Sequence, residues 1–246
     1  MHVNDAKMYK SIMELAIEYL SSRANAENVI KYSRYFKEGY DAWGSSLADN
    51  QALVKIIEEQ YPDLSMAQVI ELGSLLFKHG KYEMGSVALI LITNRIKDYD
   101  KFVFAGIKSW FDHGVGNWGH SDYLCSQVTP PFILKNIIDY HDMQSWITSG
   151  SRWTRRAVPV TLLCMRKTAK PEDLIKFIEP LMLDSERVVH QGTGWFLREL
   201  WKLHPAPVEE LLYKYRNTSA RLIIQYATEK MSKEQKERFK KLRIEN

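Results

Sequence analysis

The sequence predicts an all-α fold, a solenoid in which pairs of helices stack one after another. Apolar residues recur at spacings of three and four along most of the chain, as they do on one face of a helix. The alternation of apolar and polar residues that is typical of strands is nearly absent, and the segments between periodic stretches are only a few residues long. At 246 residues, of which 45% are hydrophobic, the chain is predicted to form one domain, residues 1–246.

The clearest helical periodicity marks five segments, 6–21, 51–61, 66–78, 84–97 and 171–182. Clusters of turn-forming residues separate helices at 61–63, 79–81, 98–100 and 204–207. The highly charged stretch 232–246 is predicted to be a terminal helix. Pro159 is expected inside the helix that carries Arg156, and Gly192 and Gly194 are expected to loosen the start of the helix that carries Trp195.

An internal repeat supports the solenoid. Segments 83–95, 154–166 and 190–202 can be laid over one another, at offsets of 71 and 36 residues, and each ends in a basic residue that suits the carboxyl end of a helix. Repeats of roughly 35–47 residues built from helix pairs are typical of HEAT-like proteins, whose stacking produces a curved surface. The predicted fold is therefore a HEAT-like α-helical solenoid with a concave groove.

Composition excludes several classes of protein. No apolar stretch approaches the roughly 20 residues that span a membrane, and charged residues interrupt the first 22 positions, unlike a signal peptide. The two cysteines, Cys125 and Cys164, form no disulfide framework or metal-ligand pattern, which suits a reducing compartment. We therefore expect a cytoplasmic protein, associated with the nucleoid if bacterial, that has no metal site and no membrane partner.

Charge is unevenly distributed along the chain. Residues 1–100 carry 11 Lys and Arg against 14 Asp and Glu, a net charge of −3, whereas residues 101–246 carry 23 against 16, a net charge of +7. Such an excess attracts a polyanion if the basic residues share one face, and it is equally compatible with an ordinary solvated face.

Four residues recur at the repeat spacing. Trp118 and Asp122 are four apart and share one helix face, Arg156 follows 38 residues after Trp118, and Trp195 follows 39 residues after Arg156. In a curved solenoid these positions would converge on one patch of the groove. The alternative is that the tryptophans, of which the chain has seven, simply pack between helices.

Three strings resemble the AlkD-like DNA alkylation repair glycosylases. They begin at Asn117-Trp118, with Asp122 four residues after the tryptophan, at Trp153, with Arg156 three residues later, and at Gly194-Trp195, followed by Arg198-Glu199. The resemblance covers about residues 30–230. It implies that Trp118 and Trp195 flank the sugar of the damaged nucleotide, that Asp122 faces its anomeric carbon, and that Arg156 contacts the backbone phosphate. The family grips duplex DNA in its groove and need not swing the base into a pocket, unlike most enzymes that act on bases.

The implied activity is a monofunctional one, hydrolysis of the N-glycosidic bond of cationic N3- or N7-alkylated purines such as 3-methyladenine and 7-methylguanine. Such a base is already a good leaving group, and a carboxylate beside the sugar would stabilise the developing positive charge. No cofactor is expected, and the expected state is a monomer bound to double-stranded DNA. Arg152, Arg155 and Arg198 are assigned to the DNA backbone.

Two other interpretations remain. The first is a non-catalytic HEAT-like module that binds DNA or a protein through the same groove, and the second is a scaffold whose tryptophans only pack. Asp122 favours the enzyme over these two interpretations. A surface that only binds a polyanion has no need of a carboxylate between two tryptophans and an arginine.

Overall fold

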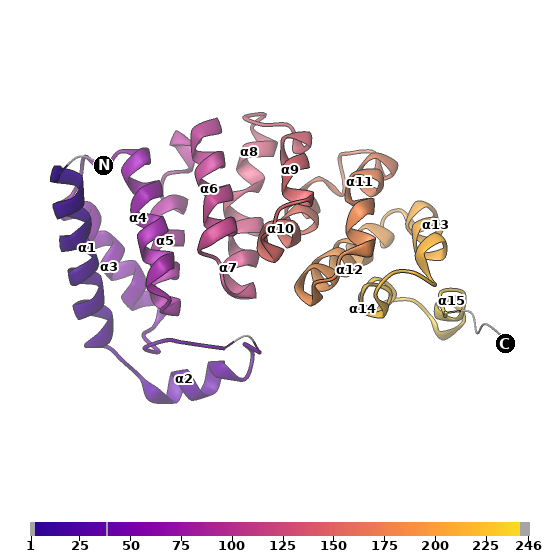
Figure 1. The fold of residues 1–246 in the computed structure, drawn as a ribbon, viewed down its shortest axis with the longest axis horizontal. Coiled ribbons are helices and arrows are strands. Elements are labelled where there is room, and N and C mark those ends of the chain that lie inside the picture. The colour runs from indigo at the N-terminus through magenta and orange to yellow at the C-terminus, as the bar shows by residue number, and fades with distance from the viewer. Residues whose placement is uncertain (1–2, 38, 242–246) are drawn as a thin grey trace. The chain divides into compact units, whose positions relative to one another are not determined.

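The computed structural model describes residues 3–37 and 39–241, and every regular element in these ranges is a helix (Figure 1). The predicted all-α solenoid is confirmed, and the predicted groove stays a prediction. No helix in the described part of the chain is long and apolar enough to cross a membrane.

Contacts divide the chain into two compact units, Met1–Phe132 and Ile133–Asn246, hereafter the N-terminal and C-terminal units. The sequence predicts that residues 1–246 form a single domain. Whether the two units form one domain is not tested by these contacts, so the single domain stays a prediction. The terminal helix expected at 232–246 is present as α15 (Lys233–Glu237), and residues 242–246 of that prediction lie outside the described residues.

The helices of the N-terminal unit form two layers. One layer contains α1 (Val3–Ser21), α4 (Met66–His79) and α6 (Lys101–His113), and the other contains α3 (Leu47–Gln60), α5 (Tyr82–Thr93) and α7 (Trp118–Tyr123). Neighbouring helices contact one another within each layer, and α1 with α3 and α4 with α5 are in contact across the layers. Short elements complete this unit: η1 (Ile96–Asp98), the π-helical turn η2 (Leu124–Val128), and α8 (Pro130–Leu134), which crosses the boundary of the two units.

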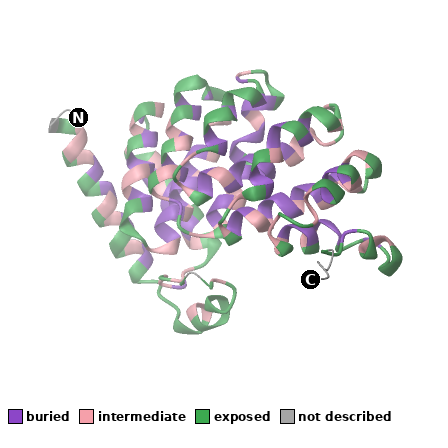
Figure 2. Ribbon diagram, turned by 45° about the vertical axis from the view of Figure 1, so that its right-hand side comes forward, coloured by how far each residue is buried: buried purple, intermediate pink, exposed green. Residues whose placement is uncertain are grey.

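Local sequence explains where these helices begin and end. Ser46 and Ser65 cap α3 and α4 in capping boxes with Asp49 and Gln68, so the predicted starts are confirmed to within a few residues. Gly80 ends α4 in a left-handed conformation, with φ of 91°. Buried residues recur at helical spacing, and their side chains fill the space between the layers. They form the purple interior in Figure 2.

One part of the N-terminal unit stands outside the layers. Helix α2 (Ala26–Ser33) has no buried residue and lies at the ends of the stacked helices (Figures 1 and 2). The described residues that follow, 34–37 and 39–46, return to the start of α3 without regular helical structure. We call this return segment, residues 34–46, the strap.

The C-terminal unit repeats the two-layer pattern. Helices α10 (Arg152–Leu162), α12 (Arg187–Trp201) and α14 (Arg221–Ala227) pack in succession, and α11 (Pro171–Ile178) contacts α13 (Pro205–Tyr215) beside them. Shorter elements connect them: η3 (Tyr140–Met143), α9 (Gln144–Ile147), η4 (Leu163–Met165) and η5 (Glu179–Leu183).

Three sequence predictions need correction here. The expected turn at 204–207 is the first turn of α13, because Pro205 occupies a first helical position, where its missing N–H costs nothing. The expected helix 171–182 changes to a 3-10 turn at Glu179, just before Pro180. Gly192 and Gly194 do not loosen a helix start, because α12 begins at Arg187; they lie in its buried interior, where a neighbouring helix approaches closely.

Candidate functional site

Trp118 is the first residue of α7, and a segment outside this helix holds its side chain in place. Asn117 caps α7 by accepting from the backbone N–H of His120, and the Trp118 side chain stays 40% exposed. Its indole N–H donates to the carbonyl of Tyr35 in the strap at 3.0 Å, and its ring stacks on Phe36, with centroids 5.2 Å apart and 17° between the planes. The strap therefore determines how this indole is presented.

Asp122 follows Trp118 by one helical turn and lies on the same face of α7. Its side chain is neither buried nor fully exposed. Directly after it the helix widens into the π-helical turn η2. Such turns are rare and occur often at functional sites, since the extra residue re-aims the side chains around it.

The strap is held by a buried carboxylate. Glu83 of α5 is 1% exposed, and its two oxygens accept the backbone N–H groups of Trp43, at 3.0 Å, and Gly44, at 2.6 Å. The backbone N–H of Tyr82 donates to the carbonyl of Asp41 at 2.8 Å, and Lys81 forms an ion pair with the Asp41 carboxylate. Because the strap also holds Trp118, Glu83 acts on Trp118 through the strap.

Glu83→Gln is expected to loosen the strap, since a glutamine offers one acceptor oxygen and turns its NH₂ toward a backbone N–H. The free energy of unfolding should fall by about 1–3 kcal/mol, the cost of a buried donor left unsatisfied. The near-ultraviolet circular dichroism of the stacked aromatic rings should also decrease. Glu59→Gln, on the exposed side of α3, is the matched control and should change neither measurement. Unchanged stability and dichroism in Glu83→Gln would show that the strap does not depend on this carboxylate.

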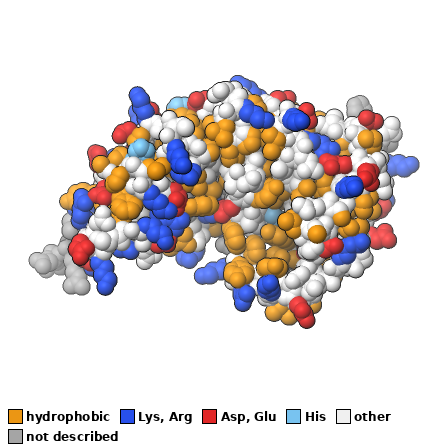
Figure 3. All heavy atoms as spheres, turned by 180° about the vertical axis from the view of Figure 1, so that it is seen from behind, with side chains coloured by type: hydrophobic (Ala, Val, Ile, Leu, Met, Phe, Trp, Pro, Cys, Tyr) orange, Lys and Arg blue, Asp and Glu red, His pale blue; other side chains and the backbone are white. Residues whose placement is uncertain are grey.

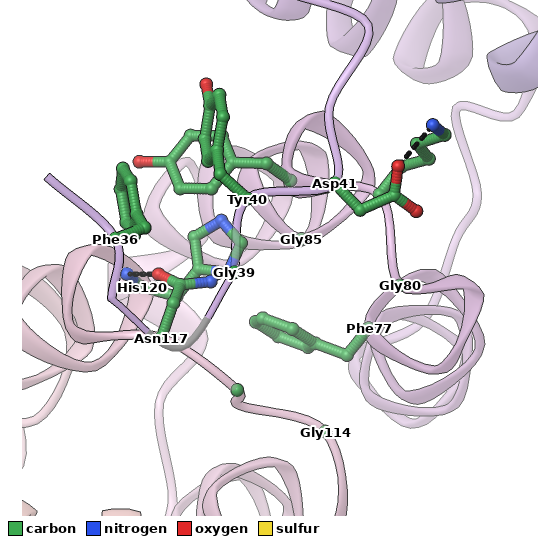
Figure 4. A pocket seen from close by; sticks show the side chains of 13 residues that line it. Phe36, Gly39, Tyr40, Asp41, Phe77, Gly80, Gly85, Gly114, Asn117 and His120 are labelled. Atoms are coloured by element: carbon green, nitrogen blue, oxygen red, sulfur yellow. Dashed lines mark hydrogen bonds and ion pairs between the residues drawn. The ribbon is translucent and has the colours of Figure 1, made fainter. Parts of the chain in front are cut away.

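His120 of α7 is buried in the N-terminal unit as a neutral ring. It stacks on Tyr82, with centroids 4.4 Å apart, and the Asn117 side-chain amide lies 3.0 Å from its Nδ1. Burial lowers the pKa of His120 to about 4, so the ring is uncharged near neutral pH. It lines a cavity of about 300 Å³ together with the strap residues Phe36 and Tyr40, as Figure 4 shows. A side chain at Gly85 would fill the space that His120 occupies, since its Cβ would lie 2.4 Å from the ring.

Within the C-terminal unit, Arg156 of α10 packs against α12, the helix that carries Trp195. Arg156 is 5% exposed, its Nη1 donates to the carbonyl of Val188 at 2.7 Å, and its side chain crosses Gly192 of α12. Positions 188, 192 and 195 form one stripe of α12, so Trp195 is the next residue along the face that Arg156 covers. Trp195 is partly exposed, and a position of its ring beside the Arg156 side chain stays a prediction.

The three arginines assigned to the DNA backbone differ in their surroundings. Arg155 binds Asp184, with Nε 2.6 Å from a carboxylate oxygen, and donates to the carbonyl of Ser149. Arg198 forms ion pairs with Glu199 and Glu229. Arg152 is more exposed, with 44% of its side chain accessible, a long contact of 3.7 Å to Glu186, and its guanidinium 5.7 Å from the centroid of the Trp153 ring. On the face shown in Figure 3, basic side chains stand among acidic and hydrophobic ones. Contact of these arginines with DNA stays a prediction, for which Arg152 is the most accessible.

The four predicted site residues are divided between the two units, and their convergence on one patch stays a prediction. The N-terminal unit brings Trp118 and Asp122 together on α7, and the C-terminal unit brings Arg156 against the α12 face of Trp195. A carboxylate one turn from an exposed indole can stabilise positive charge that develops on a bound group.

Sequence reasoning missed the residues that support Trp118, namely Phe36, Tyr40, Tyr82, Glu83 and His120. One signal was present. The strap and the end of α2 contain Tyr32, Tyr35, Phe36, Tyr40 and Trp43 without helical periodicity. Such a density of aromatic residues outside a periodic segment indicates that they pack on something distant in the sequence.

Comparisons with known proteins agree with this architecture. Residues 16–231 match the model of a family described as DNA alkylation repair enzyme. A comparison with curated protein sequences finds no match. Among solved structures, the "Predicted DNA alkylation repair enzyme from Enterococcus faecalis" is similar in fold, with a TM-score of 0.70 and 20% sequence identity over 86% of this chain and 98% of that chain. Because the family model spans most of the sequence, this chain belongs to the DNA alkylation repair enzyme family.

Proposed function

We propose that this protein is a DNA glycosylase that hydrolyses the N-glycosidic bond of cationic N3- or N7-alkylated purines in duplex DNA. The observation that carries the proposal is the pair on α7, where Asp122 lies one turn from an exposed Trp118 whose orientation is held by the strap. Membership of the DNA alkylation repair enzyme family supports DNA as the substrate.

In the proposed reaction, the bond between the anomeric carbon and the purine nitrogen breaks and its electron pair moves onto the cationic base, which leaves neutral. The sugar becomes an oxocarbenium-like cation, and water then adds to the anomeric carbon and loses a proton. The Asp122 carboxylate would stabilise that cation and orient the water. The indoles of Trp118 and Trp195 would attract the same charge, by roughly 0.5–2 kcal/mol each.

The proposed role of Arg156 is to hold a backbone phosphate of the damaged nucleotide. Its position supports this role, since the Val188 carbonyl and the Gly192 backbone fix the side chain along α12. A guanidinium held in one orientation matches the fork of phosphate oxygens better than a mobile lysine does.

Release of free base from duplex DNA containing 7-methylguanine tests the function. We expect free 7-methylguanine and abasic sites, with no strand cleavage until the abasic site is cleaved by heat or alkali. If the protein binds this DNA but releases no base at saturating concentration, the chain is a non-catalytic binding module.

Arg152→Ala is expected to weaken binding to duplex DNA at low salt and to lower the slope of log K against log[salt] by about 1, because one phosphate contact is lost. Lys10→Ala is the control and should leave the slope unchanged, because Lys10, whose side chain is 77% accessible, belongs to the acidic N-terminal hundred residues. Binding that is insensitive to salt would contradict an electrostatic DNA interface.

A further inference from the structure

Two adjacent arginines of α10 contact the start of α12, all within the C-terminal unit. Arg156 donates to the carbonyl of Val188 in the first turn of α12. Arg155 binds Asp184, which lies two residues before Glu186, the N-cap residue of this helix. The two arginines therefore join α10 to the same end of α12, one to the segment before the helix and the other to its first turn.

The guanidinium of Arg155 is satisfied within the protein. Its Nε and Nη2 lie 2.6 and 3.3 Å from the two carboxylate oxygens of Asp184, and its Nη1 donates to the carbonyls of Ser149 and Gly150 at 2.7 and 3.3 Å. Only 15% of the Arg155 side chain is accessible. An arginine that binds a DNA phosphate presents this fork of N–H groups to the phosphate oxygens. In Arg155, groups of the chain itself occupy the fork.

Asp184 connects Arg155 to α12. One of its carboxylate oxygens accepts both from Arg155 and from the backbone N–H of Glu186, the latter at 2.8 Å. The carbonyl of Asp184 accepts from Nε2 of His190, one turn into the helix, at 2.5 Å. The side chain of Glu186 makes no capping hydrogen bond. A helix with such an N-cap depends on other groups to fix its first turn, so Asp184 holds the start of α12 from outside the helix.

A shift of α12 against α10 would displace the residues proposed for the site in this unit relative to one another. Val188, which binds Arg156, and Trp195 both belong to α12. A Cβ at Gly192 would lie 3.1 Å from Cγ of Arg156, so the two helices are in close contact there. Misplacement of a group by about 1 Å can lower the rate of a reaction about 100-fold. The position of α12 therefore matters to both Arg156 and Trp195.

We propose that Arg155 is a positioning residue, which acts through Asp184 on the start of α12 and thereby on Arg156 and Trp195, and that it does not bind a DNA phosphate. Its effect on base release rests on the proposed function, whereas its effect on the position of Trp195 does not. The two roles make different demands on the side chain. A phosphate contact requires a positive charge, and the bonds to Asp184 and the two carbonyls require the shape of a guanidinium.

Arg155→Lys separates the two roles, because lysine keeps the charge but lacks the guanidinium fork. Single-turnover release of 7-methylguanine should fall by about 10–100-fold. The slope of log K against log[salt] for duplex DNA should keep its parental value. Asp184→Asn should lower base release to a similar extent, although it makes the protein more basic, and the double variant should be little worse than either single variant. Arg216→Lys is the control and should change neither measurement, since Arg216 donates to the carbonyl of Tyr213 at the end of its own helix.

Fluorine NMR follows the position of Trp195 without DNA. In protein labelled with fluorotryptophan, the resonance that disappears in Trp195→Phe belongs to this residue. Arg155→Lys and Asp184→Asn should both shift that resonance, and Arg216→Lys should leave it in place. A substitution that only lowers the stability of the fold would leave the resonance of the folded protein where it is in the parent.

An unmoved Trp195 resonance in Arg155→Lys overturns the inference whatever the rate of base release. Parental base release in this variant, from a protein that is active, also overturns it. A salt slope lowered by about 1 in Arg155→Gln, with the resonance unmoved, would return Arg155 to the DNA backbone. If the parent protein releases no base, the proposed activity fails, and the resonance alone decides whether Arg155 positions α12. If Asp184→Asn does not fold, Arg155→Lys decides.

Discussion

Asp122→Asn is expected to lower the release of 7-methylguanine from duplex DNA by roughly 10–1000-fold, the range for loss of one electrostatic stabiliser. Asparagine keeps the size and polarity of the side chain but removes its charge. That charge is useful only when the sugar becomes cationic, so its loss lowers the rate of bond cleavage more than substrate binding. Single-turnover release of base, measured with protein in excess, isolates this step.

Binding of Asp122→Asn to undamaged DNA should remain the same or become slightly tighter, because a carboxylate that faces a polyanion is mildly repulsive. Asp63→Asn, in the exposed turn after α3, is the control and should release base at the parental rate. If Asp122→Asn also does so, Asp122 is not the catalytic carboxylate, and the binding-module interpretation becomes the better one.

Gly194→Val is expected to destabilise the C-terminal unit by about 3 kcal/mol or more, the upper part of the range for overpacking. A Cβ at Gly194 would lie 2.5 Å from Cβ of Tyr226 and 2.9 Å from the carbonyl oxygen of Ile223. Both atoms belong to or lie beside the backbone of α14, so no flexible side chain can move aside. Helices α12 and α14 must then separate, and the neighbouring Trp195 must move with α12.

Chemical denaturation with urea measures this loss of stability. Gly150→Val is the matched control, because a Cβ at Gly150 meets nothing within 4 Å and its backbone has no positive φ. The control should therefore unfold close to the parental midpoint. Parental stability in Gly194→Val would mean that α12 and α14 pack less closely than the structure shows.

Much of the fold followed from local sequence. The periodic apolar positions of α1, α3, α4 and α11 predicted their extent to within a few residues, since burying one face of a helix requires that spacing. Capping signals agreed with them, as at Ser65, where a serine precedes a glutamine by three residues. The pairing of Trp118 with Asp122 also followed from spacing, because residues four apart share a helix face.

Other features required the tertiary structure because they depend on contacts between residues distant in the sequence. The bond from Trp118 to the Tyr35 carbonyl joins positions 83 residues apart, and Glu83 reaches Gly44 across 39. No local pattern distinguishes a glycine that loosens a helix from one, such as Gly194, that admits a neighbouring helix. Sequence alone therefore determined the all-helical fold, the approximate extent of several helices and the residues proposed to carry chemistry. The tertiary structure decided how Trp118 is oriented, that Glu83 serves as an anchor, and that His120 and the strap line a cavity, since orientation and enclosure arise only where separate elements pack together.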